Sequence, residues 1–144
     1  MDARAAEDVD EPGAIEVEVW SSLAEGADRI VASLVPETAD RLVAVLPLEP
    51  ADYRDDFDTI ESVERFDHLL AMAARVEIVG ADASGSRESA YERAGLRVVE
   101  NCDVLLALWD GGTARGRGGT AEIVDAARRL GRELVVIPTE RATA

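Results

Sequence analysis

Apolar and polar positions follow two different periods along this chain, and the two periods alternate. Short apolar runs, and one run in which apolar and acidic residues alternate, predict β-strands at residues 14–20, 42–46, 76–79, 104–109 and 134–137. Apolar residues three or four positions apart predict helices at residues 23–34, 60–73, 87–101 and 119–130, the third of them interrupted or bent near Gly95. Alternating strands and helices indicate a mostly parallel sheet, in a Rossmann-like, three-layer α/β fold.

The segments that flank the predicted helices and strands allow two further predictions. Ser21 and Ser22 precede the first predicted helix, where serine side chains cap free backbone amides. Residues 49–58 are predicted to form a polar loop. Within this loop, Tyr53 and Phe57 are candidates for a lid that stacks on a base, although a core position is favoured for Phe57 more than for Tyr53.

Length and composition set the expected organisation. The chain has 144 residues, of which 47% are apolar, so it is long enough for one core and short for two. We expect residues 1–13 to form a flexible acidic leader and residues 14–144 a single nucleotide-binding domain. No apolar run approaches the ~20 residues of a membrane span, and the first residues lack the order of a secretion signal. A cytoplasmic protein without a membrane partner is therefore predicted.

Charge and rare side chains narrow the function classes. The chain has 30 acidic against 15 basic residues and a net charge of −15, which disfavours binding to nucleic-acid polymers. The single cysteine, Cys102, allows no disulfide framework and no thiolate metal site, so an inert packed thiol is favoured. His68 is also alone, which argues against zinc and against a serine–histidine–aspartate triad. We therefore expect no metal and no cofactor.

Residues 104–122 are the most informative stretch, and they read V-L-L-A-L-W-D-G-G-T-A-R-G-R-G-G-T-A-E. An apolar strand runs into a glycine-rich loop and then into a helix start. Glycines let the backbone approach a ligand closely, and free amides at a helix start favour an anion. The predicted phosphate site consists of Gly118, Gly119 and Thr120, assisted by two cations, Arg115 and Arg117. Two alternatives stay open, namely that Thr120 only caps the helix and that both arginines are solvated loop side chains.

Four phrases of the sequence resemble one protein family. They are SSLAEGADRIVA (21–32), LPLEPADYRDDF (46–57), AYERAG (90–95) and CDVLLALWDG through GRGGTAEI (102–123). Together they resemble the SLOG superfamily, a group of Rossmann-like proteins that includes the cytokinin-activating phosphoribohydrolases and the DNA-processing protein DprA. The resemblance covers residues 21–138 and implies a nucleotide site at the carboxyl ends of parallel strands.

The resemblance also implies roles for individual residues. The glycine–threonine turn described above matches the family's phosphate-binding turn. Gly26 and Asp28 match a small-residue helix start that faces this turn, and Asp110 closes the strand beside the pocket, where its carboxylate would accept hydrogen bonds from ribose hydroxyls. For Gly26 and Asp28 a structural role carries similar weight, since Gly26 also allows its helix to pack close to the sheet. The alternative for Asp110 is that it only caps a turn.

The sequence departs from the catalytic relatives at one position. Those relatives carry a glutamate three residues after the glycine–threonine pair, where this chain has Ile123. The acid here is Glu122, one residue earlier, and one residue turns a helix by about 100°. Binding without turnover, in a sensor or regulatory domain, is therefore favoured. The alternative is an N-glycosidase or phosphoribohydrolase that acts on nucleoside monophosphates with Glu122 as its acid, so enzymatic activity stays open.

A second departure concerns the family's first strand. Family members usually begin with a strand and a glycine–histidine–arginine turn, and nothing before Ser21 resembles them. In the family that strand lies in the middle of the sheet. Three options follow: coding sequence upstream of Met1, a rearranged 14–20 strand, or a sheet completed by another chain. An unpaired interior edge invites strand pairing, so a homo-oligomer is an expected arrangement besides binding of a nucleotide-like small molecule.

Overall fold

Parallel strands in two sheets form the frame of the computed structural model, which describes residues 17–33, 41–109, 111 and 119–138. The first sheet has the order β1-β2-β3, and the second joins β4 to β5. Their bounds are β1 (Val19–Ser21), β2 (Leu42–Leu46), β3 (Arg75–Ile78), β4 (Val104–Trp109) and β5 (Glu133–Pro138). All of these pairs are parallel, with Val19 opposite Leu42 and Val104 opposite Glu133. The predicted parallel α/β frame is confirmed.

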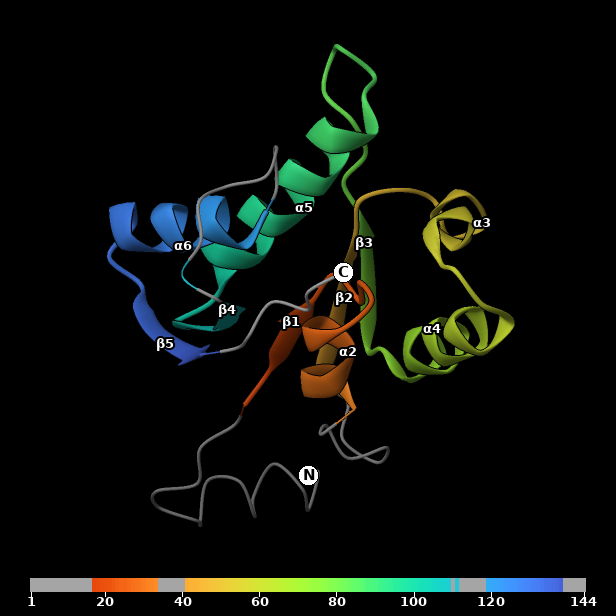
Figure 1. Ribbon diagram of the computed structural model, residues 1–144, viewed down its shortest axis with the longest axis horizontal. Helices are drawn as coiled ribbons and strands as arrows, with labels where there is room; N and C mark the ends of the chain where they lie inside the picture. Colours follow the sequence, from red (N-terminus) through yellow and green to blue (C-terminus); the bar gives the residue numbers. More distant parts are fainter. Residues whose placement is uncertain (1–16, 34–40, 110, 112–118, 139–144) are drawn as a thin grey trace, which may run out of the picture.

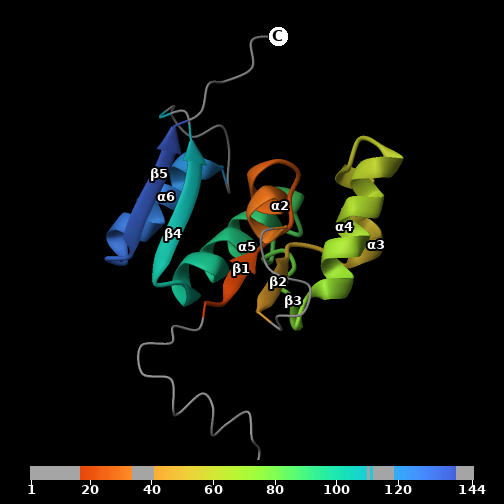
Figure 2. The same ribbon diagram turned by 90° about the horizontal axis from the view of Figure 1, so that it is seen from below.

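Helices lie on both sides of these strands (Figures 1 and 2). They are α2 (Ala27–Ala32), α3 (Pro50–Tyr53) with the 3-10 turn η1 (Arg54–Asp56), α4 (Ile60–Met72), α5 (Arg87–Asn101) and α6 (Thr120–Arg129). The group α2, α3 and α4 covers one face of the first sheet, and α5 covers the other. α6 packs on α5 and on β4 and β5. This is a three-layer arrangement of the Rossmann-like type.

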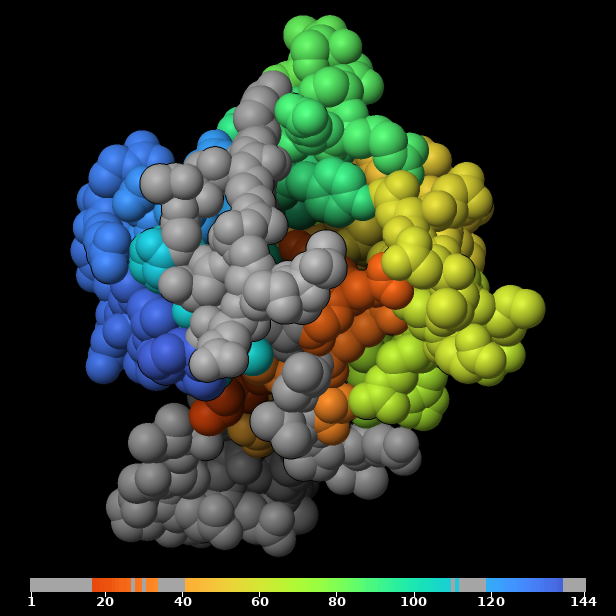
Figure 3. Space-filling model, in the orientation of Figure 1, coloured from red at the N-terminus to blue at the C-terminus, as the bar shows by residue number. Residues whose placement is uncertain are grey.

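The central strand β2 shows why the layers form, because its alternate side chains are buried on opposite faces. Its even-numbered residues face α2 and α4 and its odd-numbered residues face α5; the two sets are Leu42, Ala44 and Leu46, and Val43 and Val45. In the space-filling view, α2 lies directly against α4 (Figure 3). Another core joins α5, α6 and β4 through Val99, Leu105, Ala126 and Ala127.

Two local predictions are wrong. The first helix begins at Ala27 rather than at residue 23, because Leu23 takes a left-handed conformation with φ 56° and Gly26, with φ 91°, becomes the N-cap. The predicted loop 49–58 contains α3 and η1, with Pro50 in the first helical turn, where its fixed φ suits a helix. Of the two alternatives at Gly95, the interruption is excluded because α5 continues through this residue, and the bend stays a prediction.

The predicted strand 14–20 overlaps β1 only at Val19 and Trp20, since residues 17 and 18 precede the strand and residues 14–16 lie outside the described residues. The remaining strand and helix predictions lie close to the observed bounds. The segments 42–46, 87–101 and 104–109 agree with β2, α5 and β4 residue by residue. Residues 1–13, predicted as an acidic leader, lie outside the described residues. Within the described part of the chain, no helix combines the length and the apolar character needed to cross a bilayer.

Candidate ligand cavity

A cavity of about 780 Å³ lies between the two sheets. Its wall is formed by β1 and β4, by the connection that follows β1, by α2, by Tyr53 of α3, by α5 and by the first turns of α6. Open α/β sheets usually bind ligands outside the carboxyl ends of their strands, where successive connections leave toward opposite faces. The cavity reaches that end of β1 and of β4, so it is the candidate site.

Hydrogen bonds hold the connection after β1 in a defined shape. Ser21 Oγ accepts a bond from the amide of Leu23 at 3.1 Å and so supports the left-handed conformation there. The hydroxyl of Tyr53 donates to the carbonyl oxygen of Ser22 at 3.0 Å. Ser21 and Ser22 are therefore wall residues that shape the turn, and neither caps α2, contrary to the sequence prediction.

Asp28, in the first turn of α2, belongs to the cavity wall. One carboxylate oxygen accepts a bond from the amide of Ala24 at 3.3 Å. Burial raises the pKa of Asp28, and this amide and the neighbouring Arg29 only partly oppose the effect. The Asp28 carboxyl can therefore accept or, when protonated, donate a hydrogen bond. Gly26 caps the same helix but is not part of the wall.

The start of α6 meets the cavity at Thr120. The N-cap of this ten-residue helix is Gly119, with φ −72°, which has no side chain to accept bonds from the first amides. The structure thus brings Thr120 and Asp28 to one cavity. The other predicted contacts Asp110, Arg115, Arg117 and Gly118 lie outside the described residues.

The acid predicted for the hydrolytic alternative has a different place. Glu122 lies in the first turn of α6 but is not part of the cavity wall, whereas its neighbour Ile123 is. The role of Glu122 as a general acid stays a prediction.

The charges of the cavity wall would attract two different parts of a ligand. The described wall carries the carboxylates of Glu18, Glu25, Asp28 and Asp103, and among these described wall residues there is no arginine, lysine or histidine. A phosphate would therefore interact with the amides at the start of α6, where the helix dipole is positive. Hydroxyl and amino groups of the same ligand suit the carboxylates.

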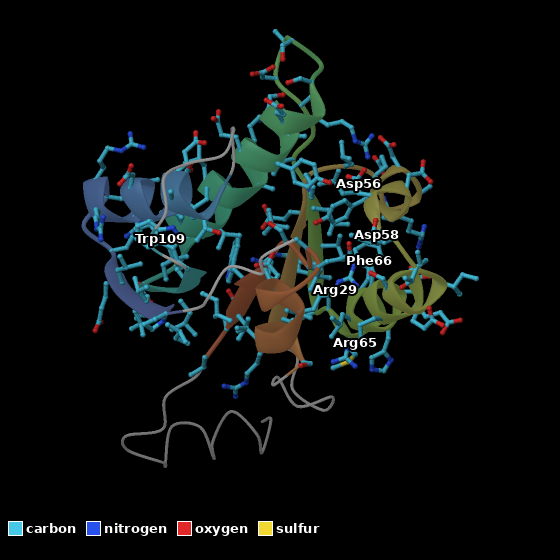
Figure 4. All side chains as sticks on the ribbon, viewed as in Figure 1. Arg29, Asp56, Asp58, Arg65, Phe66 and Trp109 are labelled. Carbon is cyan, nitrogen blue, oxygen red and sulfur yellow. The ribbon has the colours of Figure 1, made fainter. Side chains whose placement is uncertain are left out.

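The predicted aromatic lid is a core cluster instead. Tyr53 is only 1% exposed and packs its ring against Phe57, Phe66 and Tyr91, with centroids 4.9, 5.4 and 5.9 Å apart. Tyr53 is thus more buried than Phe57, the reverse of the expectation. Arg29 of α2 crosses to this cluster and lies 4.2 Å from the centroid of Phe57 (Figure 4).

The acidic residues of this region form ion pairs. Arg87 of α5 donates to Asp52 at 3.0 Å and to Asp56 at 2.8 Å, and Tyr91 also donates to Asp56. These bonds attach α3 and η1 to α5. In the ranges that the structure describes, no three histidine, cysteine, aspartate or glutamate side chains are grouped to hold a metal ion.

Sequence reasoning left three wall residues without a defined contact. Cys102 is half-buried, lies in the wall and donates to the carbonyl of Val99 at 3.5 Å, and burial raises the pKa of its thiol. Trp20 contacts the guanidinium groups of Arg75 and Arg97, which lie 5.2 and 5.9 Å from the centroid of its ring. Tyr91 reaches the wall from α5. The only signal in the sequence was their position at strand ends and in helices facing the sheet.

Comparison of the chain with protein-family models, with curated proteins and with solved structures gave no match.

Proposed function

We propose that this chain binds a nucleotide or a nucleotide-derived small molecule and acts as a cytoplasmic sensor or regulatory domain of the SLOG type. The observation that carries the proposal is the presence of Asp28 and Thr120, from two distant helix starts, in the wall of one cavity. The volume of about 780 Å³ falls in the range of roughly 300–1,000 Å³ that small-molecule sites occupy.

The wall chemistry supports one orientation of such a ligand. A phosphate at the start of α6 would accept bonds from backbone amides of the first turn, to which the N-cap Gly119 offers no side-chain acceptor, and the Thr120 hydroxyl would add a donor. Ribose hydroxyls or exocyclic amino groups would donate to Asp28 and Glu25. A compound with one phosphate end and one donor-rich end therefore fits better than a simple anion.

A thermal-shift screen with AMP, GMP, ADP, ATP and NAD tests the proposal. A ligand at 100 times its Kd stabilises the fold by roughly 2.7 kcal/mol, which is a readily measured shift in Tm. Thr120→Val removes only the hydroxyl in the wall and should reduce that shift. Thr59→Val is the matched control, because Thr59 caps α4 outside the wall and its loss should lower Tm without changing the ligand's effect.

The outcomes separate the alternatives. No shift with any of the five compounds at millimolar concentration would contradict nucleotide binding. A shift accompanied by release of free base from AMP or GMP would support the hydrolase instead of the sensor. An equal ligand effect in wild type and Thr120→Val would place the ligand away from α6.

A further inference from the structure

β1 and β4 each use one edge for pairing. β1 pairs with β2, and β4 pairs with β5; within the described residues, neither forms a ladder on its other edge. Residues 17–21 and 104–108 both line the cavity, so the two open edges border the same space. Figures 1 and 2 show β1 between β2 and β4. Unpaired strand edges present rows of donors and acceptors that another strand can satisfy.

The length of α5 bears on the direction of the two open edges. β3 is connected to β4 by α5, whose 15 residues extend about 22 Å, roughly the length of a six-residue strand. A helix of this length can carry the chain back to the end where β3 began, and we infer that β4 runs in the same general direction as β3. Because β3, β2 and β1 are parallel, a strand placed between β1 and β4 would be parallel to both.

One face of the second sheet is not covered by the described helices. Leu105 and Ala107 of β4 are buried toward α6, but the alternate residues are not. The exposed apolar side chains on this face are Val104, Leu106, Val135 and Ile137, each at least 41% exposed. Contiguous exposed apolar surface of this kind marks an interaction site.

The charges of the cavity wall are placed at its two ends. Glu18 and Asp103 precede β1 and β4, and Glu25 and Asp28 lie beyond the carboxyl end of β1. Between these ends the wall is apolar, with Val19 of β1 and Val98 of α5 among its residues. A complementary segment would therefore be apolar in its middle and basic at both ends.

We propose that the space between β1 and β4 is a binding slot for one β-strand of a different polypeptide, apolar in the middle and flanked by basic residues. Its backbone bonds to both open edges would join the two sheets into one parallel sheet. A second copy of this chain fits less well, because each copy carries a net charge of −15. The strand would fill the cavity and face the same Glu25 and Asp28 that are assigned above to the nucleotide, so the two ligands would compete; binding of the strand itself does not depend on nucleotide binding.

A capped heptapeptide, acetyl-Arg-Val-Thr-Val-Thr-Val-Arg-amide, is the probe. Its valines would face α5 and α6 and its threonines the open side. Hydrogen–deuterium exchange of the full chain should slow at least tenfold for amides of residues 104–108 when the peptide is saturating. The same peptide N-methylated at its three valines cannot donate those ladder bonds and should give no protection. Equal protection by both peptides, or none by either, would overturn the proposal.

Reversing one charge in the cavity wall tests whether the wall recognises the basic ends of the peptide. Asp103→Lys should weaken binding of the arginine-flanked peptide at least tenfold and favour a glutamate-flanked version. Asp125→Lys is the control, because Asp125 is exposed on α6 and is not part of the wall. Peptide affinities that do not differ between the two variants would overturn the proposal. So would a concentration-dependent dimer of the chain alone that itself protects residues 104–108, since the occupant would then be a second copy.

Discussion

Gly95 of α5 and Ile123 of α6 share one space in the cavity wall: a Cβ at residue 95 would lie 2.5 Å from Cδ1 and 3.1 Å from Cγ1 of Ile123. The glycine therefore lets Ile123 pack directly against the backbone of α5. Ile123 stands where the resemblance places a catalytic glutamate, and in this fold that position serves helix packing.

We expect Gly95→Ala to bring the wild-type protein little or no net stability, because the shift forced on Cδ1 and Cγ1 of Ile123 offsets the roughly 1 kcal/mol by which alanine exceeds glycine in helix propensity. In an Ile123→Ala background, the same substitution should instead stabilise by up to about 1 kcal/mol, since the obstructing atoms are gone. Urea unfolding of the four proteins measures this coupling. Identical effects of Gly95→Ala in both backgrounds would contradict the contact.

Arg29 supplies a second prediction, because its buried guanidinium joins α2 to α4. Nε donates to the carbonyl of Leu23 at 3.0 Å, Nη1 donates to Ser62, and the group lies over the ring of Phe57. Arg29→Met removes these bonds and leaves buried acceptors unsatisfied, so we expect a loss of about 2–4 kcal/mol in the free energy of unfolding.

The control for this substitution is Arg65→Met, since Arg65 is an exposed arginine on α4 (Figure 4). Surface changes of this kind usually stay within about 0.5 kcal/mol. Chemical denaturation of both variants measures the contrast. An equal loss in the two would show that the buried contacts of Arg29 contribute little.

The strands and long helices were predictable from the sequence because their side-chain pattern is set by burial on one or two faces. β2 and β4 are continuous apolar runs, and the amphipathic α4 begins after a threonine that caps it. The side-chain pattern did not predict the structure where tertiary contacts determine the backbone conformation. The left-handed conformation of Leu23 buries its side chain completely, and no period in the sequence encodes that.

The candidate site could be predicted only in part for a similar reason. Thr120 follows the glycine-rich loop, and Asp28 lies in the phrase at residues 21–32 that carries the family resemblance, so sequence alone indicated both. The contributions of Tyr91 and Cys102 to the wall depend on how α5 crosses between the two sheets. The absence of a ladder between β1 and β4 among the described residues likewise has no local signature, because the side-chain pattern of a strand does not depend on whether its edge is paired.

The hydroxyl of Tyr53 gives a third prediction. It joins the aromatic cluster to the carbonyl of Ser22 at the rim of the cavity, and burial raises the pKa of Tyr53 so that the phenol stays protonated. Tyr53→Phe should cost about 1 kcal/mol, the net value of one hydrogen bond. Hydrogen exchange should also become faster at residues 22–26. A stability loss without faster exchange there would show that the bond does not hold this connection.

The buried carboxyl of Asp28 makes stability depend on pH. Because burial raises its pKa in the folded chain, the group is protonated in both states well below its unfolded pKa and costs nothing there. As pH rises, the unfolded chain releases the proton first, so this group lowers the free energy of unfolding until pH exceeds the folded pKa.

Asp28→Asn keeps an oxygen to accept from Ala24 and has no proton to release. The variant should therefore gain stability relative to wild type between about pH 5 and pH 8, by roughly 1.4 kcal/mol for each unit of the pKa difference. Urea unfolding across this range measures the difference, and a difference that shrinks as pH rises would mean that the Asp28 carboxylate is stabilised in the fold rather than penalised.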